Sequence, residues 1–182
     1  MPKLTTLALE IGFEYASEFD AGELVFSQEV RAMCASGRCK RYGKCWSCPP
    51  ACGSIEALER RARKFSRCVL VQTVAALDGD FDAEGIKAAE EAHKRRFDTL
   101  SRQAKLVTRG EFLPMGAGSC TRCVQCTYPD KPCRHPDKLW PSMEAYGLLV
   151  SDACKSAGLE YYHGPGTITY SSCILINEEE QP

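Results

Sequence analysis

Two short stretches of this chain are dense in cysteine, and they constrain its folding more than any other feature. Residues 34–53 hold five cysteines and residues 120–133 hold four, out of twelve in 182 residues. Thiols gathered so closely either form disulfides or bind metal, and both outcomes fix the path of the surrounding chain. We therefore expect both stretches to be loops whose shape depends on what the cysteines hold.

The rest of the composition decides between those two outcomes. Hydrophobic residues make up 44% of the chain and charged residues 26%, so a globular core can form without disulfide support. The N-terminus has no signal-peptide pattern, and no apolar run is long enough to span a membrane, so we predict a cytoplasmic protein. Disulfides are rare in that compartment, which favours metal binding. A net charge of −1 argues against nucleic acid or membrane as a partner.

Hydrophobic periodicity predicts a fold of alternating strands and helices. Residues 68–74 form an apolar run typical of a buried strand, residues 83–107 repeat apolar side chains at helical spacing, and residues 167–177 predict a last strand. We expect an α/β fold, with α+β as the alternative: one compact domain over residues 1–182, built as a sandwich of a mixed sheet and helices. Its appendages would be cysteine loops at 34–53 and 116–141 and an acidic tail at 178–182.

The second cysteine stretch predicts a metal centre most directly. Cys120, Cys123 and Cys126 form a C-x2-C-x2-C run, and Cys133 follows seven positions later. Three thiolates at steps of three can wrap one [4Fe–4S] cluster when a more distant cysteine supplies the fourth ligand. Zinc is the alternative, although structural zinc usually takes two separated C-x2-C pairs. His135 is interpreted as a neighbour of the site, since Cys133 is the better ligand type.

The first stretch carries one thiol more than a four-ligand site needs. Its Cys45-x2-Cys48-Pro segment resembles the elements of cluster-binding loops. Basic side chains interleave with the cysteines and could offset thiolate charge, dock an acidic redox partner protein, or simply be solvated. The cysteines are Cys34, Cys39, Cys45, Cys48 and Cys52, and the basic residues are Arg38, Lys40, Arg41 and Lys44.

Several motifs together resemble a known family. They are Tyr42–Pro50 (YGKCWSCPP), Gly116–Cys126 (GAGSCTRCVQC), Cys133–Pro136 (CRHP) and Pro141–Gly147 (PSMEAYG). In combination they resemble the predicted metal-binding proteins of a domain of unknown function, DUF2284, over nearly the whole chain. The resemblance implies a metal-binding, iron–sulfur protein of anaerobic prokaryotes, and it implies no particular reaction.

The resemblance also implies which cysteines bind metal. The family's motif cysteines correspond to Cys34, Cys39, Cys48, Cys120, Cys123, Cys126 and Cys133. Cys45 and Cys52 are additional. We predict Cys45 as the fourth ligand of the first site, because a C-x2-C pair closes tightly and Pro49 stiffens its exit. The competing interpretation is a three-cysteine site with an open iron, in which Cys45 is a free nucleophile.

Three functional hypotheses follow from these patterns. The first is a protein with two [4Fe–4S] clusters that acts in electron transfer or as a redox accessory protein to an anaerobic enzyme system. The alternatives are a zinc-stabilised interaction module and an enzyme that uses an open-site cluster. No standard dinucleotide or P-loop motif is present. Cys68, Cys154 and Cys173 lie in apolar contexts and are interpreted as buried core residues, and His93 as a packed helix residue.

Overall fold

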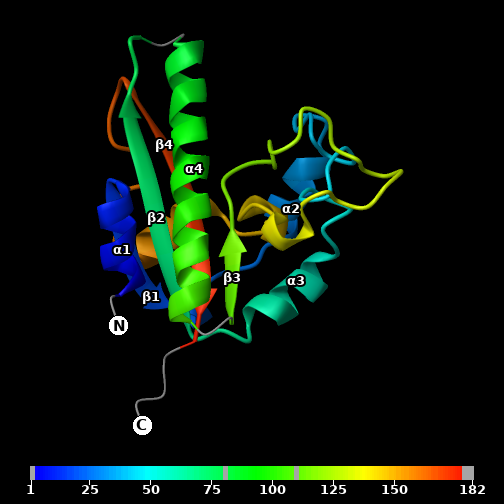
Figure 1. The fold of residues 1–182 in the computed structure, drawn as a ribbon, viewed down its shortest axis with the longest axis horizontal. Coiled ribbons are helices and arrows are strands. Elements are labelled where there is room, and N and C mark those ends of the chain that lie inside the picture. The colour runs from blue at the N-terminus through cyan, green and yellow to red at the C-terminus, as the bar shows by residue number, and fades with distance from the viewer. Residues whose placement is uncertain (1–2, 80–81, 109–110, 178–182) are drawn as a thin grey trace.

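A computed structural model describes residues 3–79, 82–108 and 111–177, so the expected acidic tail at 178–182 lies outside the described residues (Figure 1). The strands are β1 (Tyr15–Asp20), β2 (Arg67–Ala76), β3 (Phe112–Met115) and β4 (Thr167–Ile176). The α-helices are α1 (Leu4–Ile11), α2 (Gln28–Ala35), α3 (Ile55–Ala62), α4 (Ala83–Val107) and α5 (Val150–Ser156). Short 3-10 turns are η1 (Ala21–Glu23), η2 (Pro136–Lys138) and η3 (Glu144–Tyr146).

The four strands form one sheet in the order β1-β2-β4-β3. The predicted combination of a sheet with helices in a compact α/β arrangement is confirmed, but the expectation of a mixed sheet is wrong. Each ladder between the described strands is antiparallel. Strands β2 and β4 pair antiparallel along ten residues, and the chain between them carries α4, β3 and the second cysteine loop.

Helices α1 and α4 cover one face of the sheet. Alternate residues of β2, Val69 and Val71, point to this face and pack against Phe97 and Leu100 of α4 and Leu4 of α1. Helix α4 presents an apolar stripe to the sheet because its hydrophobic residues recur every three or four positions. Asp82 caps its N-terminus by accepting a hydrogen bond from the backbone of Gly85.

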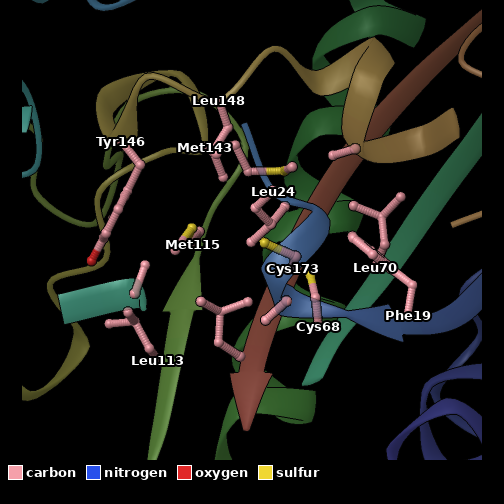
Figure 2. Close-up of a cluster of buried hydrophobic side chains, with 14 of the residues drawn as sticks. Phe19, Leu24, Cys68, Leu70, Leu113, Met115, Met143, Tyr146, Leu148 and Cys173 are labelled. Atoms are coloured by element: carbon pink, nitrogen blue, oxygen red, sulfur yellow. The ribbon is translucent and has the colours of Figure 1, made fainter. Parts of the chain in front are cut away.

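The opposite face of the sheet packs against the segments that carry the cysteine loops (Figure 2). Cys68 and Leu70 of β2 point into this cluster, as does Cys173 of β4, and Met143 and Tyr146 reach it from the segment around η3. The alternating strand pattern therefore serves two cores at once, because successive side chains leave a strand on opposite faces.

Strand β3 leads directly into the second cysteine loop at the edge of the sheet. Beyond Met115, Gly116 forms a parallel bridge with Ser142, and its backbone donates a hydrogen bond to Pro141. The two ends of the 116–141 loop are thereby held together, while the loop itself projects away from the sheet (Figure 1). Within the described residues, no helix combines the length and the apolar character needed to cross a membrane.

Candidate metal centre

The two cysteine loops lie side by side, although about seventy residues separate them in sequence (Figure 1). Three hydrogen bonds join them. The backbone of Cys120 donates to Ser47 Oγ at 3.1 Å, Arg41 donates to the Cys120 carbonyl at 3.3 Å, and the Trp46 indole donates to the Lys131 carbonyl at 3.1 Å. The Trp46 ring also meets Tyr128 edge-to-face at 4.9 Å.

Tight turns give the first loop its shape. The backbone of Cys48 donates to the Cys45 carbonyl at 3.0 Å, and that of Cys52 donates to the Cys48 carbonyl at 3.1 Å. Gly43, with a φ of 65°, closes the loop by donating to Pro49 at 2.8 Å. Glycine is suited to this position because a side chain disfavours positive φ. These turns bring Cys45 and Cys48 inward, and both are buried.

Through Cys45, a thiol of the first loop lies next to a thiol of the second loop. The neighbouring thiols of Cys120 and Cys48 lower the pKa of Cys45, and the same interaction raises the pKa of the other two. Ser47 Oγ lies 3.2 Å from the Cys45 sulfur and supports it further. Cys45 therefore loses its proton more readily than Cys48 or Cys120, and thiolates rather than thiols are metal ligands.

A cavity of about 20 Å³ lies between the loops. Five cysteines from both loops line it: Cys45, Cys120, Cys123, Cys126 and Cys133. Among the described residues, no three cysteine, histidine or carboxylate side chains already converge as a metal-binding group. The thiols thus surround the cavity without meeting at one point. Soft thiolate donors suit zinc and iron–sulfur centres, so the donor set fits either metal.

The cavity also has donors for a negatively charged centre. Arg41, Arg122, Arg134 and Lys138 line it beside the cysteines. The Nε atom of Arg41 is buried and has no hydrogen-bond partner among the described residues, so this donor is available to a ligand sulfur. The backbone of His135 donates to the Cys133 sulfur at 3.4 Å. Positive charge and N–H donors stabilise metal-bound thiolates.

The other four cysteines of the first loop do not line this cavity, although Cys48 among them lies beside Cys45. Cys34 is on the last turn of α2, and burial raises its pKa. Cys39 is exposed, and its proximity adds to the rise in the pKa of Cys34. The Cys52 sulfur lies 3.6 Å from a guanidinium nitrogen of Arg31, which also donates to the carbonyls of Gly53 and Ala145. The structure therefore separates Cys34, Cys39 and Cys52 from the five cysteines that line the cavity.

Residues interpreted as structural occupy structural positions. Cys68, Cys154 and Cys173 are fully buried in the core facing the loops, and all twelve cysteines have free thiols. His93 is fully buried on α4 as a packed residue, while His135 is exposed at the rim of the cavity. The prediction of core cysteines and of a packed His93 is confirmed.

The comparisons with known proteins bear on the same residues. The family described as "Predicted metal-binding protein (DUF2284)" matches residues 17–176, which include both cysteine loops. This chain belongs to that family. The expected resemblance and the expected metal binding are thus confirmed at the level of the family. No curated protein and no solved structure matches the chain.

Sequence reasoning missed the side chains that join the two loops. Ser47 contacts Cys45 and receives the Cys120 backbone hydrogen bond, and Trp46 reaches Lys131 across the gap. Arg122 forms an ion pair with Asp98 of α4 and so fixes the second loop to the helix. The only signal available in the sequence was the position of Trp46 and Ser47 inside the C-x2-C pair.

Proposed function

We propose that this member of the DUF2284 family is an iron–sulfur protein that transfers electrons or serves as a redox accessory protein, located in the cytoplasm. The observation that carries the proposal is the cavity lined by five cysteines from two loops. The run of Cys120, Cys123 and Cys126 supplies three of its thiols at the spacing that a cubane cluster needs, and either Cys133 or Cys45 provides a fourth.

A second cluster is part of the proposal. Its ligands would be Cys34, Cys39 and Cys48, with Cys45 or Cys52 as the fourth. Cys45 lines the cavity with the second-loop cysteines, so its contacts favour that centre, and Cys52 is then the better fourth ligand for the first. In either case the clusters supply one-electron redox chemistry. The chain's own residues hold them, compensate their charge and exclude water.

A redox partner protein would dock on the basic loop. Arg38, Lys40 and Lys44 are exposed beside the first cysteine stretch, whereas Arg41 turns inward to Cys120. Val124, between two candidate ligands, is fully exposed. Charge reversal at Lys40 and Lys44 should slow reduction by a small acidic electron-transfer protein, mainly at low ionic strength. Unchanged rates would remove this surface from the proposal.

The size of the cavity favours a second candidate function, a zinc-stabilised interaction module. A volume of about 20 Å³ holds a single ion or water. A cubane would require the loops to move apart. In the zinc case the metal would contribute folding free energy without redox chemistry.

Anaerobic purification followed by iron, sulfide and zinc assays tests the proposal. The expected result is a brown protein with iron and acid-labile sulfide and absorption near ~400 nm, the thiolate-to-iron charge-transfer region. A colourless protein with stoichiometric zinc and no sulfide would replace the redox function by the zinc module.

Variants of the two additional cysteines locate the ligands. Cys45→Ser and Cys52→Ser are compared by iron content and by electron paramagnetic resonance of the reduced protein. We expect each variant to lose part of the iron, with different spectra, because Cys45 lies with the second loop and Cys52 does not. Retention of all iron in both variants would favour a three-cysteine site with an open iron, and with it the enzyme hypothesis.

A further inference from the structure

A larger cavity lies against helix α4, next to the candidate metal centre. Its volume is about 440 Å³, within the range of sites for small organic molecules. The rim contains exposed residues such as Lys87 and Gly118, and the floor contains the buried His93 and Phe97. The cavity therefore runs from the surface to the apolar core between α4 and the sheet.

The floor of this cavity offers aromatic surface. The rings of Phe97 and Trp140 meet edge-to-face at 5.6 Å, and both residues line the cavity. Gly116 and Ala117 form part of the opposite wall and leave room because they have little or no side chain. A planar apolar group fits such a surface, since aromatic side chains supply dispersion contacts over a large area.

A chain of hydrogen bonds reaches the floor of the cavity. Arg96 donates to Thr73 Oγ1 at 3.3 Å, and Thr73 Oγ1 lies 3.0 Å from His93 Nδ1. His93 Nε2 lies 2.8 Å from Ser172 Oγ, and both His93 and Ser172 line the cavity. Both ring nitrogens of His93 are thus paired, which holds the imidazole in place at the floor.

The charged residues around the cavity leave an excess of positive charge. Five basic residues and three acidic residues line it. Asp98 pairs with Arg122, Glu90 with Lys94, and Glu91 is shared by two basic side chains of α4. The ammonium group of Lys138 has no ion-pair or hydrogen-bond partner within the described ranges. An anionic group would supply that partner and gain from the positive surroundings.

The two cavities share one wall. Cys120, Arg122 and Lys138 line both of them, so a molecule in the larger cavity would lie beside a candidate ligand of the metal centre. Arg122 is held in place there by Asp98, and its guanidinium lies over the Trp140 ring at 5.0 Å. Asp98 belongs to α4 and Trp140 packs against the core between α4 and the sheet, so this wall is anchored to the helix layer.

We propose that the cavity between α4 and the Gly116–Ser119 segment binds a small carboxylic acid with a planar apolar body. The body would rest on Phe97 and Trp140, and the carboxylate would face Lys138. The binding itself follows from this cavity alone. The role of this cavity as a substrate or effector site beside a metal centre rests on the proposed function.

Fluorine NMR of ligand binding tests the proposal directly. The probes are para-fluorobenzoate and para-fluorophenylacetate, each compared with its uncharged primary amide at the same concentrations. We expect the acids to bind with about millimolar dissociation constants, as small fragments do, and at least about threefold more tightly than the amides. Absence of binding by both acids, or equal affinity for acids and amides, would overturn the proposal.

Variants place the probe in the cavity. Ala117→Leu fills the space and should abolish binding of both acids. Lys138→Gln should weaken it by up to about fivefold, the upper end of the range for an exposed charge contact. Lys155→Gln removes the same charge from an exposed position on α5, outside the cavity lining, and should leave affinity unchanged. If the Ala117→Leu variant bound both acids with unchanged affinity, the proposed location of the site would be wrong.

Metal assays on the same samples keep the two proposals separate. Iron, sulfide and zinc contents report on the metal centre, and the acid-to-amide ratio reports on the cavity. A protein that holds no iron but prefers the acids would contradict only the redox function. A protein that holds its clusters but shows no preference would contradict only the carboxylate site.

Discussion

The imidazole of His93 is fully buried between α4 and the sheet. Both of its ring nitrogens have hydrogen-bond partners, Thr73 and Ser172, so the neutral ring is well accommodated. Burial, together with the positive charges of Arg96 and Lys94, lowers its pKa from 6.5 to about 3. A buried group with this pKa makes the stability of the protein depend on pH.

Acid should therefore destabilise the folded protein. Between about pH 6.5 and pH 3 the unfolded chain binds a proton at this histidine and the folded chain does not, so stability falls as pH falls. Chemical denaturation at pH 7.5 and 5.0 should show a loss of about 2 kcal/mol from this residue. His93→Gln should remove that part of the pH dependence. Thr73→Val keeps the imidazole and should keep the pH dependence; a flat response there would contradict the assignment.

Helices α2 and α3 are positioned by the segment that contains Gly147. The backbone of Ser27, the N-cap of α2, donates to the Gly147 carbonyl at 2.8 Å, and Phe26 bridges to Leu148. Gly147 has a φ of 82°, and a β-carbon there would lie 2.8 Å from the Ser27 carbonyl oxygen and against the Ile55 side chain. The Gly147 segment, the start of α2 and the start of α3 approach one another so closely that this position requires glycine.

Gly147→Ala should destabilise the protein strongly. The left-handed backbone costs an alanine about 1–2 kcal/mol, and the collision with Ser27 and Ile55 should raise the total loss to at least about 3 kcal/mol. Gly158→Ala is the matched control, because Gly158 also has positive φ but no atom near its β-carbon position. Its expected cost is about 1 kcal/mol. Equal costs in urea denaturation would show that packing around Gly147 is not tight.

At the scale of the molecule, the sheet and the cysteine loops differ in what holds them. Strands β2 and β4 pair along ten residues and are packed on both faces. The loops are joined to each other by three hydrogen bonds and one aromatic contact, and much of their surface is exposed. A ligand held by thiols of both loops would add the missing restraint.

Removing the metal should therefore loosen the loops and spare the sheet. Chelation of the anaerobic protein should lower the melting temperature by about 5 to 10 °C, if the metal concentration before chelation is well above the dissociation constant. Hydrogen exchange should quicken in residues 34–53 and 116–141, while β2 and β4 stay protected. Uniform loss of protection would instead show that the metal maintains the whole fold.

Local patterns in the sequence were enough to predict much of this protein. The apolar repeat of residues 83–107 predicted α4 with its bounds, and the apolar run at 68–74 predicted most of β2. The apolar settings of Cys68, Cys154 and Cys173 predicted their burial, and the motifs around the cysteines indicated the family. Each of these features is encoded in neighbouring residues, because helix and strand periodicity and ligand spacing are local properties.

The tertiary structure alone decided how distant segments meet. It made the sheet antiparallel, placed Cys45 against Cys120, and formed a cavity between α4 and the second loop. Spacing within a loop fixes only which thiols are close along the chain. Contacts between residues about seventy-five positions apart depend instead on how both faces of the sheet are buried, and that is a property of the whole packed molecule.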